Sequence, residues 1–256
     1  MGDALYGYCL KNGHEKHFSI NNDYLGKMYS DDEINDAINT FVNNHSNIEL
    51  IRYDNEQDML KAFAQVIADG KVTCRFNGRS EFGPRALGNR SILMDPRVAE
   101  NKDILNSRVK FREAFRPFAP VVLYEDLKEY FNISFESPYM LIVADVLKPD
   151  EIPAVTHVDN SARVQTVKRS DSPGLYGIIE EFKKITGVPV ILNTSFNIAG
   201  EAMVESPEDA LNCFYKTDID CIMIGNCIIS KTQKYSEIDL NALRQFTISL
   251  GKNLDC

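Results

Sequence analysis

The chain has 256 residues, of which 44% are hydrophobic and 25% are charged, a balance typical of a soluble globular protein. Its formal net charge is −9, which argues against a nucleic-acid partner because proteins that bind nucleic acid carry a basic face. No apolar run approaches the roughly 20 residues of a membrane helix, and the N-terminus lacks the pattern of a signal peptide. The six cysteines form no Cys-x-x-Cys pair, so we expect reduced cysteines and a cytoplasmic location.

The first predicted element is the end of a helix that Gly13 closes, within a polar N-terminal stretch over residues 1–28. A new unit opens at Ser30, a predicted N-cap with Glu33 at capping-box spacing. Helical periodicity follows in Ile34, Ala37, Ile38 and Phe41. The next elements are strands over 48–53 and 72–76, with a helix over 54–69 between them that ends at Gly70.

Helices and strands continue to alternate along the rest of the chain. Strands are predicted over 91–94, 119–123, 140–146, 162–167, 188–192, 221–224 and 227–229. Helices are predicted over 99–109, 127–130, 175–186 and 207–215, and a peripheral helix and tail over 235–256. The strand over 140–146 is expected to be buried. This alternation predicts an α/β fold.

Cations gather in one stretch of this acidic chain. From Arg79 to Arg116 there are nine Lys and Arg residues against five Asp and Glu, a local charge of +4. The motif GRSEFGPRALGNRSILMDPR, residues 78–97, follows a predicted strand and contains Arg79, Arg85 and Arg90. Guanidinium groups match phosphate and carboxylate geometry, and glycine lets the backbone approach a ligand. We therefore expect a bound anion at this loop. The alternative is that these arginines form surface ion pairs with Glu81 and Asp95.

A second cationic motif, KFREAFRPFAP at residues 110–120, interleaves cations with aromatic rings. The cations are Lys110, Arg112 and Arg116. Because buried cations need an anionic partner, the motif favours ligand contact. The alternative is cation stacking on Phe111, Phe115 and Phe118.

Two further segments carry polar groups on predicted strands. Arg163 and Gln165 lie two residues apart and share one side of a strand, although an ordinary strand with a polar face would show the same spacing. The apolar strand over 188–192 runs into small hydroxyl and amide residues that can hydrogen-bond a nucleotide. These residues are Asn193, Thr194, Ser195 and Asn197. The alternative is a capped turn that leads to Gly200.

The common nucleotide-binding and nucleophile motifs are absent from the sequence. It contains neither the P-loop pattern nor the dinucleotide-binding pattern, and no Ser-His-Asp or Cys-His arrangement stands out. Many anion-binding groups without a nucleophile indicate catalysis by positioning and charge neutralisation, as in nucleotidyl or phosphoryl transfer.

A resemblance to the carbamoyltransferase family is carried by four motifs in order: GRSEFGPRALGNRSILMDPR, KFREAFRPFAP, SARVQTV and PVILNTSFNIAGEAMVESPEDAL. This family includes nodulation protein U and the O-carbamoyltransferases that act on tobramycin and cephamycin. The resemblance implies a YrdC-like C-terminal domain over residues 29–235, in which helices flank a twisted mixed sheet. A C-terminal tail would follow over residues 236–256.

In that family the C-terminal domain binds ATP and carbamoyl phosphate and forms carbamoyl adenylate, from which the carbamoyl group passes to a substrate hydroxyl. The resemblance therefore implies an ATP-dependent O-carbamoyltransferase, with Mg²⁺ bridging the phosphates. By motif position it implies catalytic roles for Lys110, Arg85 and Arg116. It implies contacts to the nucleotide by Arg79, Arg90, Arg163, Asn193, Thr194, Ser195 and Asn197.

The resemblance also implies a partner for this chain. In the family a large N-terminal domain of the actin/Hsp70-like ATPase fold completes the transfer and holds iron through a His-x-x-x-His pair and a later Asp. Residues 1–28 resemble only its last helix and exit linker, so Asp3 in GDALYG would be an orphan metal ligand. We expect iron only if a separate N-terminal ATPase-like subunit or domain supplies the other ligands.

Two functions stay open on the sequence. One is an enzyme module that forms carbamoyl adenylate. The other is a non-catalytic module that binds ATP or an adenylate and works only with a separate ATPase-like partner. A third hypothesis, RNA binding, is disfavoured by the net charge of −9, because phosphate contacts need a basic surface.

Overall fold

The structure is a computed structural model that describes residues 2–13, 22–113 and 115–232. Its helices are α1 (Gly2–Asn12), α2 (Asp31–Asn44), α3 (Glu56–Ala68), α4 (Glu100–Arg108), α5 (Leu127–Tyr130), α6 (Pro173–Thr186) and α7 (Pro207–Lys216). Its strands are β1 (Ile48–Arg52), β2 (Thr73–Phe76), β3 (Arg90–Met94), β4 (Ala119–Leu123), β5 (Ile142–Asp145), β6 (Ser161–Val167), β7 (Val190–Ser195), β8 (Cys221–Ile224) and β9 (Cys227–Lys231).

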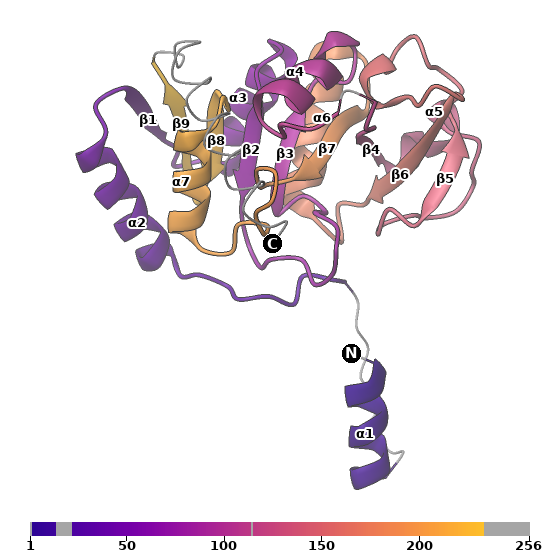
Figure 1. Cartoon of the computed structure of the whole chain (residues 1–256), viewed down its shortest axis with the longest axis horizontal. Helices are drawn as coiled ribbons and strands as arrows, with labels where there is room; N and C mark the ends of the chain where they lie inside the picture. Colours follow the sequence, from indigo (N-terminus) through magenta and orange to yellow (C-terminus); the bar gives the residue numbers. More distant parts are fainter. Residues whose placement is uncertain (1, 14–21, 114, 233–256) are drawn as a thin grey trace, which may run out of the picture.

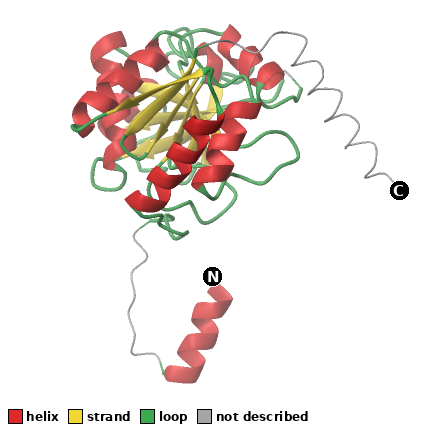
Figure 2. Cartoon of the chain, turned by 90° about the vertical axis from the view of Figure 1, so that its left-hand side faces the viewer, coloured by secondary structure: helices red, strands yellow, loops and turns green. Residues whose placement is uncertain are grey.

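The nine strands form one mixed sheet in the order β1-β9-β8-β2-β3-β7-β4-β6-β5. The pairs β2–β8 and β4–β6 are parallel and the other pairs are antiparallel. Helices lie on both faces of this sheet (Figures 1 and 2). The predicted α/β class with a mixed sheet flanked by helices is therefore confirmed.

The helix boundaries follow the predicted cap residues. Ser30 caps α2 in a capping box: its hydroxyl accepts from the Glu33 N–H, and the Glu33 side chain accepts from the Ser30 N–H. Such a box satisfies backbone donors that the first helical turn leaves unpaired. The predicted ends of α3 and α6 are also confirmed, because Gly70 and Gly187 follow them with φ of 75° and 81°.

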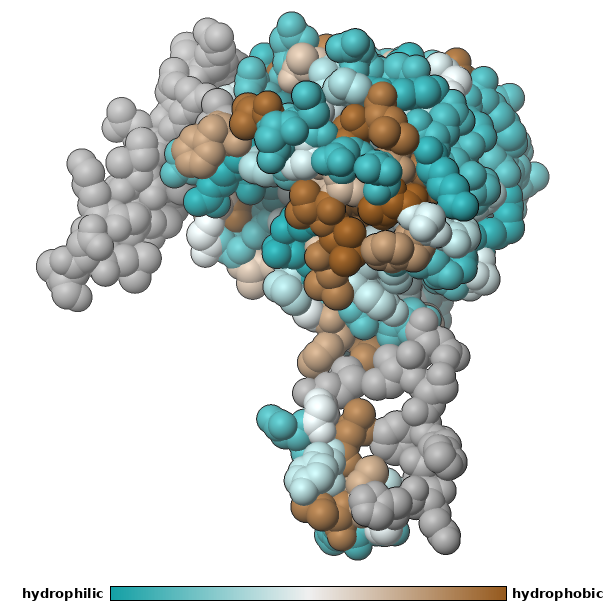
Figure 3. Space-filling model, turned by 90° about the vertical axis from the view of Figure 1, so that its right-hand side faces the viewer, coloured by the Kyte–Doolittle hydropathy of each residue, from teal (hydrophilic) through white to brown (hydrophobic). Residues whose placement is uncertain are grey.

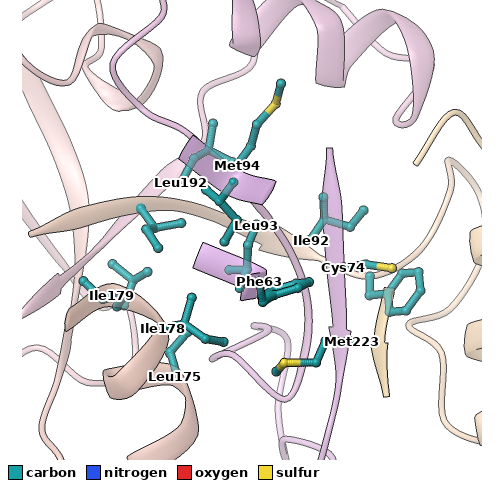
Figure 4. Packing of buried hydrophobic residues seen from close by; sticks show 14 of the residues in the cluster. Phe63, Cys74, Ile92, Leu93, Met94, Leu175, Ile178, Ile179, Leu192 and Met223 are labelled. Carbon is teal, nitrogen blue, oxygen red and sulfur yellow. The ribbon is translucent and has the colours of Figure 1, made fainter. Parts of the chain in front are cut away.

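The core fills the space between the sheet and its helices. Phe63 of α3 and Ile178 of α6 are fully buried against strand residues such as Ile92 and Leu192 (Figure 4). Burying each such side chain is worth about 1.5–3 kcal/mol. The same cluster runs from Ala37 in α2 to β9 at the far end of the described chain, so α2 belongs to the folded body.

Two strands differ from their predicted form. β5 is only partly buried: it is the last strand of the sheet, and although Ala144 is buried, Val143 is 60% and the neighbouring Leu141 76% exposed. Apolar runs are typical of buried strands, but here the apolar residues gather on the surface at the right-hand side of Figure 1, which faces the viewer in Figure 3. β7 is longer than predicted, because Asn193, Thr194 and Ser195 continue its pairing with β3.

The two ends of the chain leave predictions untested. α1 is the predicted N-terminal helix, and none of its residues is buried. A single helix does not show an ATPase fold, so the remnant over 1–28 stays a prediction, as do the domain boundaries. The predicted tail over 236–256 lies outside the described residues. Among the described residues, no helix is both long enough and apolar enough to cross a membrane.

Candidate functional site

The loop between β2 and β3 folds back on a buried carboxylate. Oε1 of Glu81 accepts the backbone N–H groups of Leu87 at 2.7 Å, Asn89 at 2.8 Å and Arg90 at 3.3 Å. A carboxylate can accept several donors, and such charge-assisted bonds are the stronger kind. The Arg/Gly motif is therefore a closed, ordered loop.

The three arginines of this loop have different surroundings. Arg79 donates to the Gly26 carbonyl at 2.9 Å. Arg90 is fully buried, lies 3.6 Å from the centre of the Phe76 ring and donates to the Asn77 and Gly78 carbonyls. Arg90 thus stabilises the start of the loop through these hydrogen bonds. Arg85 is exposed and makes no hydrogen bond or ion pair with another described residue.

The alternative that these arginines form ion pairs is not observed. No ion pair joins Arg79, Arg85 or Arg90 to Glu81 or Asp95, all of which the structure describes. Asp95 instead forms an ion pair with Arg97, in which Oδ2 of Asp95 lies 2.6 Å from Nη2 of Arg97.

Two amide side chains connect the loop to the sheet. Nδ2 of Asn193 donates to the Ala86 carbonyl at 3.1 Å and to Oε1 of Gln165 at 2.7 Å. Nε2 of Gln165 donates to the Leu87 carbonyl at 2.9 Å. Both amides are buried, and together they place the loop residues next to Arg85 over β6 and β7.

Lys110 follows α4 in the sequence. It contacts β7 at Ser195, two residues after Asn193. Its Nζ donates to the Ser195 carbonyl and hydroxyl, and to the Asn197 carbonyl at 3.0 Å and Oδ1 at 2.8 Å. The Ser195 hydroxyl also donates to Asn197 Oδ1 at 2.7 Å. The prediction placed these three side chains in one site, and the structure brings them into direct contact.

The ammonium of Lys110 has no acidic partner among the described residues. Burial, and then the nearby charge of Arg112, lower its pKa to about 7. Burial raises the pKa of the neighbouring Cys213 thiol to about 12, so that group stays neutral. A buried cation with neutral acceptors only is suited to receiving an anion.

Arg163 of β6 is a second cation of the site and is half-buried. Its Nε is buried without a hydrogen-bond partner among the described residues, and burial followed by the nearby Arg85 charge lowers its pKa. The charges of Arg85 and Arg163 repel each other, and neither guanidinium has an ion-pair partner among the described residues, so a bound anion would relieve this repulsion. Thr194 is half-buried and lies opposite Ile92 in the β3–β7 pairing.

Arg112 and Arg116 are tied to the chain around them. Nε of Arg112 donates to Asn106 Oδ1 at 2.7 Å, and its guanidinium lies 4.7 Å from the Phe118 ring. The stacking alternative therefore holds for Arg112. Arg116 is more than half exposed and forms an ion pair of 3.0 Å with Glu113, so it is not part of the buried contacts around Lys110.

A cavity of about 210 Å³ opens beside Gln165, lined also by Tyr24, Leu87 and Tyr139. Typical ligand pockets begin near 300 Å³, so this cavity has room for only part of a nucleotide. Among the described residues, no group of three or more His, Cys, Asp or Glu side chains could hold a metal ion. Asp3 lies exposed in the first turn of α1, and its role as a ligand stays a prediction.

Comparison with known proteins places this chain in the carbamoyltransferase family. The family model described as "Carbamoyltransferase C-terminus" matches residues 64–231. The nodulation protein NolNO of Sinorhizobium fredii is 49% identical over 189 residues, 72% of this chain and 27% of that protein. The 3'-hydroxymethylcephem-O-carbamoyltransferase of Amycolatopsis lactamdurans is 42% identical over 160 residues, 62% of this chain and 31% of that protein.

The chain is much shorter than these relatives. A protein of Synechocystis, sll1178, is 40% identical over 82% of this chain, which covers only 37% of its own length. Among solved structures, full-length HypF in its phosphate- and nucleotide-bound form reaches a TM-score of 0.45 at 17% identity, over 66% of this chain and 21% of that one.

Proposed function

Because the chain belongs to the carbamoyltransferase family, whose C-terminal region it carries, we propose that it forms carbamoyl adenylate from ATP and carbamoyl phosphate. The observation that carries the proposal is the set of cations without acidic partners. The charge of Arg85 acts on Arg163 and lowers its pKa after burial, and Lys110 is buried against Ser195 and Asn197. The Asn193–Gln165 pair connects the two groups of cations.

The reaction balances in two steps. Water cleaves the P–O bond of carbamoyl phosphate and releases inorganic phosphate and carbamate. A carbamate oxygen then attacks the α-phosphorus of ATP, and pyrophosphate leaves with the electron pair of the broken P–O bond. Both steps bring anions together, so fixed cations lower the barrier by neutralising charge that builds up in the transition state.

Individual side chains have distinct parts in this proposal. Arg85 and Arg163 bind phosphate oxygens, and Lys110 stabilises the charge on the phosphorus under attack. Ser195 and Asn197 orient the Lys110 ammonium through the hydrogen bonds seen here. Arg116, on the exposed side, would meet the phosphates only at the edge of the site. Mg²⁺ would be held by the phosphates themselves.

Delivery of the carbamoyl group to a hydroxyl is proposed for a larger assembly. These relatives are about two to three times as long as this chain, and one of them is named for carbamoylation of a hydroxymethylcephem. We propose that a separate ATPase-like domain or subunit supplies the acceptor site, and iron if iron is used.

The first test is pyrophosphate release from MgATP with and without carbamoyl phosphate. We expect release only when both are present. Arg85→Ala should lower kcat/KM by about 10²-fold, the usual loss when one charge-stabilising group is removed. The control is Arg169→Ala, which removes a surface arginine paired with Glu180 and should change kcat/KM less than twofold.

The results separate the two functions. Full turnover in Arg85→Ala would show that the cations do not have the proposed role. MgATP binding by calorimetry without pyrophosphate release would favour the non-catalytic binding module. If folded protein binds no nucleotide, both functions are wrong.

A further inference from the structure

We propose that Glu81 is a positioning residue that holds Arg85 in place for the anionic substrates. The inference rests on the proposed function and concerns a side chain that does not face the ligand. Glu81 is only 7% exposed, and its carboxylate binds the backbone amides of the loop on the buried side.

The hydrogen bonds of Glu81 close the loop on both sides of Arg85. The carboxylate itself precedes Arg85 by four residues, and its acceptor Oε1 binds N–H groups two to five residues after Arg85. The positions of the chain before and after Arg85 are therefore fixed relative to each other. A loop held at both ends in this way loses little further entropy when its tip binds a ligand.

The loop also has few other conformations available. Gly83 and Gly88 have φ of 127° and 121°, which residues with a Cβ rarely adopt. Arg75 donates to the Gly88 carbonyl at 2.6 Å. Ala86 and Leu87 are buried, whereas residues 82–85 are exposed. Arg85 is thus the one cationic side chain that the loop, from Phe82 to Gly88, presents to solvent.

The chemistry of Glu81 explains why a carboxylate is needed. Three donors converge on one oxygen, and the second oxygen, Oε2, is buried without a hydrogen-bond partner among the described residues. Glu81→Gln keeps the size and one acceptor oxygen. It removes the negative charge that strengthens three bonds and places an NH₂ group where Oε2 lies. We expect the loop to loosen while the sheet stays intact.

The first readout is amide hydrogen exchange, which needs no ligand. In Glu81→Gln the amides of Leu87 and Asn89 should exchange about tenfold faster, as expected when charge-assisted hydrogen bonds weaken. Amides in β4 and β7 should keep their rates. Unchanged exchange at Leu87 and Asn89 would overturn the inference whatever the protein does with nucleotide.

The second readout is a double-mutant cycle on MgATP affinity and on kcat/KM for pyrophosphate release. Glu81→Gln should cost about tenfold in kcat/KM when Arg85 is present, since small displacements of a catalytic group are costly. In the Arg85→Ala background the same change should cost less than twofold. Equal losses in both backgrounds would mean that Glu81 acts only on general stability, and the inference would be wrong.

A matched control makes the same change of charge at a nearby carboxylate. Glu205→Gln also neutralises a carboxylate near this segment, but Glu205 accepts from the Ser80 hydroxyl and not from the loop amides. It should leave both the amide exchange and kcat/KM within twofold of the wild type. If wild-type protein binds no MgATP, the proposed function fails, and amide exchange alone decides whether Glu81 orders the loop.

Discussion

At the residue scale, the protonation of Lys110 should make nucleotide binding depend on pH. Its pKa is lowered to about 7, first by burial and then by Arg112, so the side chain is largely neutral at pH 8 in the free protein. A bound polyanion favours the charged ammonium and raises this pKa. MgATP binding should therefore take up close to one proton at pH 8 and almost none at pH 6, where Lys110 is already protonated. Affinity should fall by up to about tenfold per pH unit above 7.

Calorimetry in buffers of different ionisation enthalpy measures this proton uptake directly. Lys110→Met should abolish it, whereas Arg85→Ala should weaken binding and keep the uptake, because arginine does not titrate in this range. Proton uptake that persists in Lys110→Met would assign the titration to another group. In the unliganded protein, the unfolded chain binds a proton on Lys110 that the folded chain does not bind. The free energy of unfolding should therefore rise as the pH increases from about 7 towards 10.5.

The sequence predicts which residues gather at the site better than it predicts what each one contacts. Lys110, Ser195 and Asn197 were expected together and share hydrogen bonds. Arg90 was expected near a ligand, yet it is buried on Phe76. Glu81 was considered only as an ion-pair partner. Which groups an arginine or a carboxylate contacts depends on the loop's path in space, and neighbouring residues in the sequence do not determine that path.

At the element scale, the loop between β2 and β3 needs glycine for two separable reasons. At Gly88 a Cβ would lie 2.5 Å from Leu175 Cδ2 of α6, whereas at Gly83 a Cβ would meet nothing within 4 Å. Both have positive φ, so alanine at either position incurs a backbone strain of about 1–3 kcal/mol. Only Gly88→Ala adds overpacking, worth about another 1–3 kcal/mol.

Urea unfolding of Gly88→Ala and Gly83→Ala measures this difference. We expect the free energy of unfolding to fall further in Gly88→Ala, by the overpacking contribution alone. Equal destabilisation would mean that α6 shifts freely and does not constrain the loop. Such a result would also weaken the argument that the loop is held in one position.

Periodicity and cap residues predicted the element types well, because those signals are local. The box at Ser30 and the ends of α3 and α6 are examples. The order of strands is not local. β7 lies between β3 and β4, and this central position extends it to Ser195. β5 lies at the sheet edge, and its Val143 is exposed although the sequence pattern resembles that of a buried strand.

At the scale of the whole molecule, the folded unit is larger than the segment that the family model matches. The match begins at residue 64, within α3. Yet β1 pairs with β9 along its full length, and α2 buries Ala37, Ile38 and Phe41 in the same core. α1 buries nothing. We therefore expect α2 and β1 to contribute to stability and α1 to contribute little, although all three precede residue 64.

Two truncations test this difference. A chain that starts at residue 14, and so lacks α1, should unfold in urea at the midpoint of the full chain within error. A chain that starts at residue 54, and so lacks α2 and β1, should lose the cooperative transition, because it exposes the apolar surface beneath α2 and the edge of β9. Circular dichroism and urea titration of the three chains measure both effects. A cooperative transition in the shorter chain would show that the sheet from β9 to β5 folds without its first strand, and would move the boundary of the folding unit to α3.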